Sequence, residues 1–284
     1  MNTRHQKAFA FTLLATIWVY FLGNVGGWVA PEIVFNLMNH RNYGEGLAGG
    51  AAALELLGVA LGSMGLALCA DRISVRHVAV AFAVVLVATE ALSSAAVVPG
   101  WLSTLRFGCG VAQGVLMGLA NAILANGDRP HARLAAANIV NVLLGSALLF
   151  ALAPLQHAFD ATSLFTILAI ICLVLTPFCF GLQPRLVQYQ QVPRRLGLPN
   201  AASYWLVAAM TMFACGSGAA FTFSFVMGDQ AGLAATSINT TISLAVLGAI
   251  PGSFLCGYLG DRIRPLMPIV VVLVIHALAT YSAA

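Results

Sequence analysis

Long apolar stretches separated by short polar breaks follow one another along the whole chain. Cutting at the polar and Gly/Pro-rich breaks gives nine segments, at residues 9–37, 46–69, 77–97, 101–125, 134–155, 161–182, 203–227, 233–258 and 266–284. A helix needs roughly 20 apolar residues to cross a hydrocarbon core about 30 Å thick. The pattern therefore predicts nine transmembrane helices in an all-α membrane protein.

The composition supports a chain surrounded by a lipid bilayer. Of its 284 residues, 60% are hydrophobic and 8% are charged, whereas soluble domains typically contain about 25% charged residues. The net charge of +4 comes from scattered basic residues and not from a patch, which argues against a nucleic-acid partner. The six cysteines show no CxxC spacing, so we expect no metal site, and no cofactor motif is present.

The basic residues are distributed asymmetrically between the loops. If the N-terminus is cytoplasmic, Arg41 is the one basic residue that is expected in an outer loop, and Arg106 lies within a helix. The other 11 of the 13 Lys and Arg residues then share the cytoplasmic side: Arg4, Lys7, Arg72, Arg76, Arg129, Arg133, Arg185, Arg194, Arg195, Arg262 and Arg264. This positive-inside pattern predicts a multi-pass protein of the inner or plasma membrane with a cytoplasmic N-terminus.

One sustained polar break divides the chain. Residues 183–200, QPRLVQYQQVPRRLGLPN, contain three prolines and three arginines and have no apolar period. We interpret this stretch as a cytoplasmic linker between an N-terminal six-helix bundle, residues 1–182, and three further helices in residues 201–284. Without a cleavage site, the first apolar stretch is expected to remain as a helix.

Two similar turns occupy equivalent places in these two parts. LALCADRISVRH (66–77) and GYLGDRIRPL (257–266) each follow the second helix of their part. The turns are about 190 residues apart, which indicates an internal repeat. An Asp-Arg turn that caps a helix and faces lipid headgroups is the simpler explanation of either turn alone.

The predicted fourth helix carries an arginine followed by small residues. Arg106, Gly110 and Gly114 fit the pattern R-x-x-x-G-x-x-x-G. Close helix packing explains the glycines. It does not explain the arginine, because a central Arg costs about 2.5 to 3.5 kcal/mol on insertion scales and so requires a partner or a water-filled cavity.

With these motifs the chain resembles the major facilitator superfamily over its full length. The loop signature of that family, G-x-x-x-D-[RK]-x-G-x-[RK]-[RK], is matched by Asp71, Arg72 and Arg76 but has Ala67 and Ser74 in place of glycine. In the second part it is matched by Gly257, Asp261 and Arg262. The resemblance implies that these loops lock and release the two bundles on the cytoplasmic side, so all six matching residues are gating candidates.

The resemblance also implies twelve helices, in two halves of six related by an axis along the membrane normal. Nine predicted helices correspond to the complete first half and three helices of the second half. We therefore expect the 284 residues to be truncated after the ninth helix, and the complete gene to continue for roughly another hundred residues.

Three carboxylates lie within the first three predicted helices, and we treat them as proton-coupling candidates together with Arg106. Counting at about 1.5 Å per residue places Glu32, Glu55 and Glu90 roughly 8 to 14 Å deep, at a level similar to that of Arg106. Glu32 is the preferred proton carrier, because helix one faces helix four across the cavity in the resembled family. Glu90 is a weaker candidate because the third helix is usually peripheral there. A fixed structural ion pair with Arg106 is the alternative for each of them.

Polar residues on single helix faces suggest a substrate cavity. At about 100° per residue, Arg106, Gln113, Met117 and Asn121 fall within one arc of the fourth helix. The other candidates lie on the first and fifth helices: Tyr20, Asn24, Asn138 and Asn141.

These observations favour a secondary transporter that moves a small organic solute by alternating access, with protons as the coupling ion. No nucleotide-binding loop or hydrolase motif occurs, so we expect no enzyme activity. The helix-five motif of drug–proton antiporters is incomplete, since GSALLFALAPL has no Gly-Pro pair. The solute class stays open among sugars, organic anions and drugs. The alternative is a membrane sensor or assembly subunit that has kept the transporter scaffold.

Overall fold

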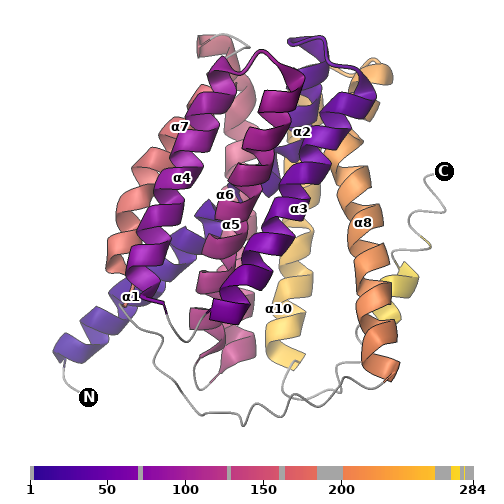
Figure 1. Ribbon diagram of the computed structural model, residues 1–284. Coiled ribbons are helices and arrows are strands. Elements are labelled where there is room, and N and C mark those ends of the chain that lie inside the picture. The colour runs from indigo at the N-terminus through magenta and orange to yellow at the C-terminus, as the bar shows by residue number, and fades with distance from the viewer. Residues whose placement is uncertain are drawn as a thin grey trace.

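The computed structural model describes residues 3–69, 73–126, 129–159, 164–183, 201–259, 270–275 and 278. Within these ranges the chain is helical and contains no strand (Figure 1). The elements are α1 (Thr3–Leu22), α2 (Val25–Asn39), α3 (Glu45–Cys69), α4 (Val75–Ala95), α5 (Pro99–Ala125), α6 (Pro130–Phe159), α7 (Leu164–Leu175), the 3₁₀ helix η3 (Thr176–Gly181), α8 (Ala201–Gln230), α9 (Ala235–Leu247) and α10 (Ala249–Leu259). The predicted all-α fold class is confirmed.

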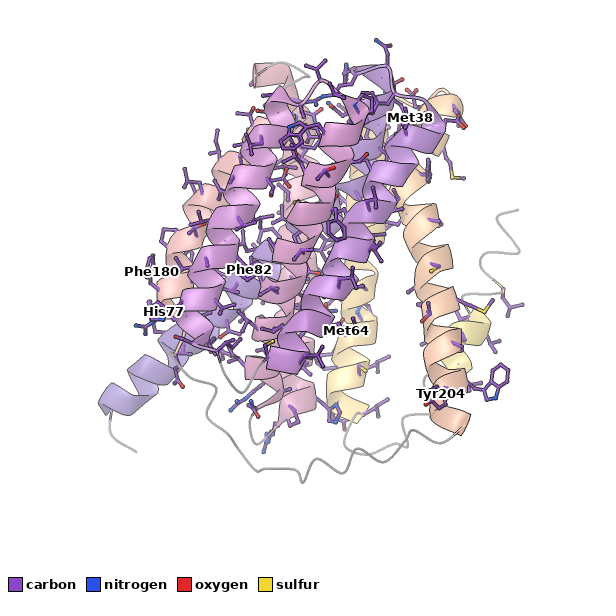
Figure 2. The ribbon with its side chains drawn as sticks, viewed as in Figure 1. Met38, Met64, His77, Phe82, Phe180 and Tyr204 are labelled. Carbon is purple, nitrogen blue, oxygen red and sulfur yellow. The ribbon has the colours of Figure 1, made fainter. Side chains whose placement is uncertain are left out.

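Among the described residues, seven helices are long and apolar enough to cross a membrane, and an eighth is added if the bent pair Thr211–Thr222 and Ser224–Gln230 in α8 counts as one span. The predicted sixth and eighth helices correspond to the spans Leu164–Gly181 and Ala235–Leu259. The predicted ninth segment, 266–284, lies mostly outside the described residues, although 270–275 are helical. Large apolar side chains such as Met64 and Phe180 are exposed on the sides of the bundle, as a lipid-facing surface requires (Figure 2).

The predicted first helix forms a single span, Phe11–Asn39, that is broken in the middle. α1 ends at Leu22, α2 begins at Val25, and the side-chain amide of Asn24 donates a 2.8 Å hydrogen bond to the backbone carbonyl of Tyr20. At Gly23 a Cβ would lie 2.6 Å from the backbone nitrogen of Met117 on α5. The break therefore lies at a point where only glycine allows the two helices to come so close.

Glycines also bring α3 and α5 into backbone contact. A Cβ on Gly58 of α3 would lie 2.8 Å from the backbone nitrogen of Val111, and one on Gly110 of α5 would lie 2.8 Å from the carbonyl carbon of Glu55. Gly114 is equally close to the α3 backbone. This close approach is the packing that the four-residue glycine spacing predicts.

The helices of the first part pack around α5, with α3 and α4 on either side of it (Figure 1). α7 packs against α4, and η3 packs against α1 and α4. The helices of the second part contact the first part through α2 and α6: α2 packs against α8, and α6 packs against α9 and α10. The centre of α5 is therefore enclosed by neighbouring helices, and the second part meets the first along α2 and α6.

Candidate functional site

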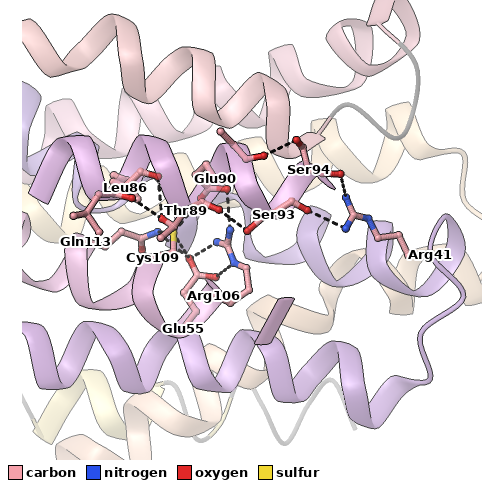
Figure 3. Close-up of polar contacts among 12 residues, drawn as sticks. Arg41, Glu55, Leu86, Thr89, Glu90, Ser93, Ser94, Arg106, Cys109 and Gln113 are labelled. Carbon is pink, nitrogen blue, oxygen red and sulfur yellow. Dashed lines mark hydrogen bonds and ion pairs between the residues drawn. The ribbon is translucent and has the colours of Figure 1, made fainter. Parts of the chain in front are cut away.

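Arg106 lies at the centre of α5 and is fully buried, with 0% of its surface exposed. Its Nη1 donates a 2.8 Å hydrogen bond to Oε2 of Glu90 on α4. Its Nε donates a 3.0 Å bond to Oε2 of Glu55 on α3, and its Nη2 lies 2.6 Å from the other oxygen of that carboxyl (Figure 3). One guanidinium therefore binds two carboxyl groups from two neighbouring helices, and its single hydrogen bond to Glu55 is accompanied by a close ion-pair contact.

Cys109 and Gln113 extend this arrangement along the same face of α5. The amide nitrogen of Gln113 donates to Oε1 of Glu55 at 2.9 Å and to the Cys109 sulfur at 3.1 Å. The Cys109 thiol donates to Oε1 of Glu90 at 3.2 Å. Glu55, Glu90, Arg106, Cys109 and Gln113 thus form one connected network, which we call the ion cluster (Figure 3).

The charges of the ion cluster do not cancel when both carboxyl groups are ionised. Two carboxylates and one guanidinium leave a net charge of one negative unit in a site shielded from water. Opposite unit charges 4 Å apart attract by about 4 kcal/mol at an effective dielectric constant of about 20, so the arginine is held firmly. The second carboxylate lacks a cation of its own, and one proton would make the cluster neutral.

Glycine on α2 makes room for the polar groups of the ion cluster. A Cβ on Gly26 would meet both Oε1 of Glu55 and the side-chain amide of Gln113. The backbone of α2 therefore packs directly against these two polar groups. Any larger residue at position 26 would displace the Glu55 carboxyl and the Gln113 amide.

A cavity of about 100 Å³ lies beside the ion cluster. Three of the predicted cavity residues line it, namely Asn24, Gln113 and Met117. The full lining is Gly23, Asn24, Gly26, Gly27, Ala30, Ile33, Ala52, Glu55, Leu56, Val59, Gln113, Met117 and Thr222. Glu55 thus belongs both to the ion cluster and to the cavity wall.

The other four predicted cavity residues do not line this cavity. Asn138 of α6 donates a 2.8 Å hydrogen bond to the hydroxyl of Ser253 on α10. Asn141 accepts a 3.2 Å bond from the indole nitrogen of Trp28. These two amides connect α6 to α10 and to α2. Tyr20 and Asn121 are half-buried elsewhere on α1 and α5.

Glu32 does not pair with Arg106, contrary to one of the alternatives considered from the sequence. It is buried on α2, and its Oε1 accepts a 2.7 Å hydrogen bond from the side-chain amide of Asn239 on α9. Depth along the membrane normal matched Glu32 with Arg106, but α2 turns this carboxyl toward the second part of the chain. Glu90, in contrast, is fully buried and pairs directly with Arg106, although the third helix was expected to be peripheral.

Only two of the gating candidates fall within the described residues. Arg76 of α4 donates a 2.9 Å hydrogen bond to the backbone carbonyl of Leu182, which ties the start of α4 to the end of η3. Gly257 of α10 lies against α6, where an added Cβ would be 2.7 Å from that of Ala135. Asp71, Arg72, Asp261 and Arg262 lie outside the described residues.

Several residues of the site were not singled out from the sequence. From the sequence, Cys109 was considered only as a metal ligand, whereas its thiol joins the ion cluster. Asn239 lies among the hydroxyl residues of the stretch ATSINTTIS, and Gly26 and Thr222 match no known motif, so none of the three was singled out. One signal in the sequence could have found Cys109. It lies three residues after Arg106 and four before Gln113, and this spacing places the three side chains on one face of a helix.

Comparison with known proteins agrees with the architecture. The family description Major Facilitator Superfamily matches residues 8–284, which is nearly the entire chain. A search of curated proteins found no match. Within the described residues, no group of His, Cys, Asp and Glu could hold a metal ion. The chain belongs to the major facilitator superfamily and is a membrane transporter.

Proposed function

We propose that this protein is a secondary active transporter that moves a small organic solute across the cytoplasmic membrane by alternating access and couples this movement to protons. The observation that carries the proposal is the ion cluster. It holds two carboxyl groups for one guanidinium, and one of those carboxyl groups lines the cavity. A proton and a solute can therefore influence each other through Glu55.

The charge balance supports protons as the coupling ion. A cluster that is negative without a proton and neutral with one changes its charge at each binding step. Since the cluster is shielded from water, this change alters the stability of the surrounding helices more than it would at a surface. Proton binding can thus favour one arrangement of the helices over another.

Glu32 is proposed to pass this preference to the second part of the chain. Its hydrogen bond with Asn239 joins α2 to α9, two helices that belong to different parts of the chain. Alternating access requires the two parts of the chain to change their contacts. The bond between Glu32 and Asn239 is one of these contacts, so it is expected to form or break during transport. A proton on Glu32 would weaken it, because the amide then meets a neutral carboxyl instead of a charged one.

The Asp-Arg loops remain the proposed lock between the bundles on the cytoplasmic side. The contacts of Arg76 with Leu182 and of Gly257 with α6 are consistent with a role for these loop regions in holding helix ends together.

The test is a solute screen in cells that express the gene, followed by flux measurements with and without an uncoupler. We expect saturable flux that falls when the proton gradient is collapsed and that is lost in Arg106→Ala. Saturable flux that ignores the gradient would overturn the proton coupling. Absence of saturable flux across a broad set of sugars, organic anions and organic cations would instead favour the sensor or assembly role.

A further inference from the structure

A second cavity lies between α1 and the first turns of α6, away from the ion cluster, and has a volume of about 370 Å³. We call it the basic groove. Its lining consists of two arginines, Arg129 and Arg133, two apolar side chains of α1, Leu13 and Ile17, and three alanines of α6. None of the described residues that line it carries a carboxyl group, so the groove presents positive charge above an apolar wall.

The two arginines stand at the start of α6, on the side of the membrane that the basic residues predict to be cytoplasmic. Nη1 of Arg133 donates a 3.1 Å hydrogen bond to the backbone carbonyl of Asn126, which fixes this side chain at the edge of the groove. Arg129 is exposed. Asp128 lies outside the described residues, and with its charge the stretch 128–133 still has two arginines against one aspartate. The local charge therefore remains positive.

The apolar wall of the basic groove continues along α6 toward the middle of the membrane. Ala136 lines the groove and is exposed, and Leu143 and Phe150 are exposed above it. Steps of seven residues turn a helix by two rounds to within about 20°, so these three residues follow one line on its surface. A soluble anion would use only the arginines. A molecule with an anionic head and an apolar chain would use the whole of this surface.

We propose that the basic groove binds an anionic phospholipid of the cytoplasmic leaflet. Its phosphate lies at Arg129 and Arg133, and one acyl chain follows α6 past Ala136 and Leu143. Guanidinium groups bind phosphate oxygens with paired hydrogen bonds, and basic pockets between transmembrane helices on the cytoplasmic side suit anionic headgroups. The bound lipid contacts α1 and α6 together and therefore stabilises their packing. This inference does not depend on the proposed function.

The experiment is native mass spectrometry of the full chain in detergent, titrated with phosphatidylglycerol and with phosphatidylcholine of identical acyl chains. We expect one phosphatidylglycerol to bind at least tenfold more tightly than phosphatidylcholine, since each basic residue near a headgroup contributes about a factor of five. Glycerol 3-phosphate serves as a soluble anion with the same phosphate ester. It should not displace the lipid, because it cannot use the apolar wall.

Charge variants locate the headgroup. Replacing both Arg129 and Arg133 by Gln should reduce phosphatidylglycerol binding to the level of phosphatidylcholine. The control replaces Arg194 and Arg195 by Gln, which removes the same charge from the predicted linker and should leave binding unchanged. Arg129→Gln alone should weaken binding about fivefold. It keeps the bond from Arg133 to Asn126, and so it decides the question if the double variant does not fold.

A variant without a charge change locates the acyl chain. Ala136→Leu fills the groove beside the arginines and should weaken phosphatidylglycerol binding at least fivefold. Ala91→Leu makes the same substitution at an exposed position on α4 and should leave binding unchanged.

Four results would overturn the inference. The first is equal binding of the two lipids. The second is an equal loss of binding in the Arg129/Arg133 and Arg194/Arg195 variants, which would indicate general attraction to a basic protein. The third is displacement by glycerol 3-phosphate, which would make the groove a site for a soluble anion. The fourth is wild-type binding in Ala136→Leu.

Discussion

The ion cluster and the contact between Glu32 and Asn239 are buried polar regions that differ in their construction. The ion cluster lies within the first part of the chain, on α3, α4 and α5, and combines full burial with ion pairs and several hydrogen bonds. The contact between Glu32 and Asn239 joins residues 207 positions apart and consists of one bond from a neutral amide. The ion cluster lies where glycines bring the backbones of α3 and α5 together. The Glu32–Asn239 bond lies where the two parts of the chain meet, and the parts are also joined by the hydrogen bond from Asn138 to Ser253.

Removing Arg106 should have the largest effect on stability and transport. Arg106→Ala leaves two buried carboxyl groups without their counter-charge, and we expect a loss of about 3–5 kcal/mol of stability together with loss of transport. Thermal unfolding in detergent measures the first effect, and flux measures the second.

A compensated variant serves as the control. Replacing Arg106 by Met and both Glu55 and Glu90 by Gln removes every charge of the cluster. Its stability should recover most of the loss, and its transport should not. Equal stability of the single and triple variants would contradict the importance of charge pairing.

The packing that supports the cluster should be next in sensitivity. Gly110→Ala places a Cβ against the α3 backbone at Glu55, and we expect a loss of about 1–3 kcal/mol. Gly108→Ala on the same helix is the control, because its Cβ would lie 3.6 Å from a methyl group of Thr89. That control should be neutral or slightly stabilising, since Ala favours helix more than Gly does. Similar losses in both variants would argue against a tight α3–α5 contact as the cause.

The bond between the parts should affect conformation more than folding. Asn239→Ala removes the hydrogen-bond donor to Glu32, which is worth about 1.5–3 kcal/mol for a charged partner. We expect a shift of roughly tenfold or more in the equilibrium between arrangements of α2 and α9, measured by distances between spin labels on these helices. Thr240→Ala, at an exposed position on the same helix, should give the wild-type distance distribution.

The smallest effect on stability is expected from cysteine substitutions in loops, which test the orientation of the helices in the membrane. Single cysteines at Asn42 and Asp229, in a background without the exposed native cysteines, should react with an impermeant reagent from outside the cell. A cysteine at Arg129 should not. These three positions are exposed and stability should hardly change. Labelling at Arg129 from outside would reverse the topology derived from the basic residues.

The positions of the helices followed from apolar length, because lipid imposes the same requirement on every span. The partners of Arg106 did not follow in the same way. Counting residues gives the depth of Glu32, Glu55 and Glu90, but not the direction in which each helix turns its side chain. Asn239 left no signal, since one amide in an apolar segment resembles any tolerated polar residue. The break at Gly23 was also missed: the stretch GNVGG at residues 23–27 interrupts the apolar run, but the whole segment was interpreted as one helix.

The ion cluster also has a consequence for how the chain enters the membrane. α3 and α4 are synthesised before α5, and each then contains one carboxyl group that a proton can neutralise. α5 brings a guanidinium that stays charged, at a cost of about 2.5–3.5 kcal/mol if it meets lipid alone. We therefore expect the insertion machinery to retain α3 and α4 until α5 arrives, so that the three helices leave for the bilayer together. In such a sequence of events, the arginine acts first as an assembly signal and only later as part of a transport site.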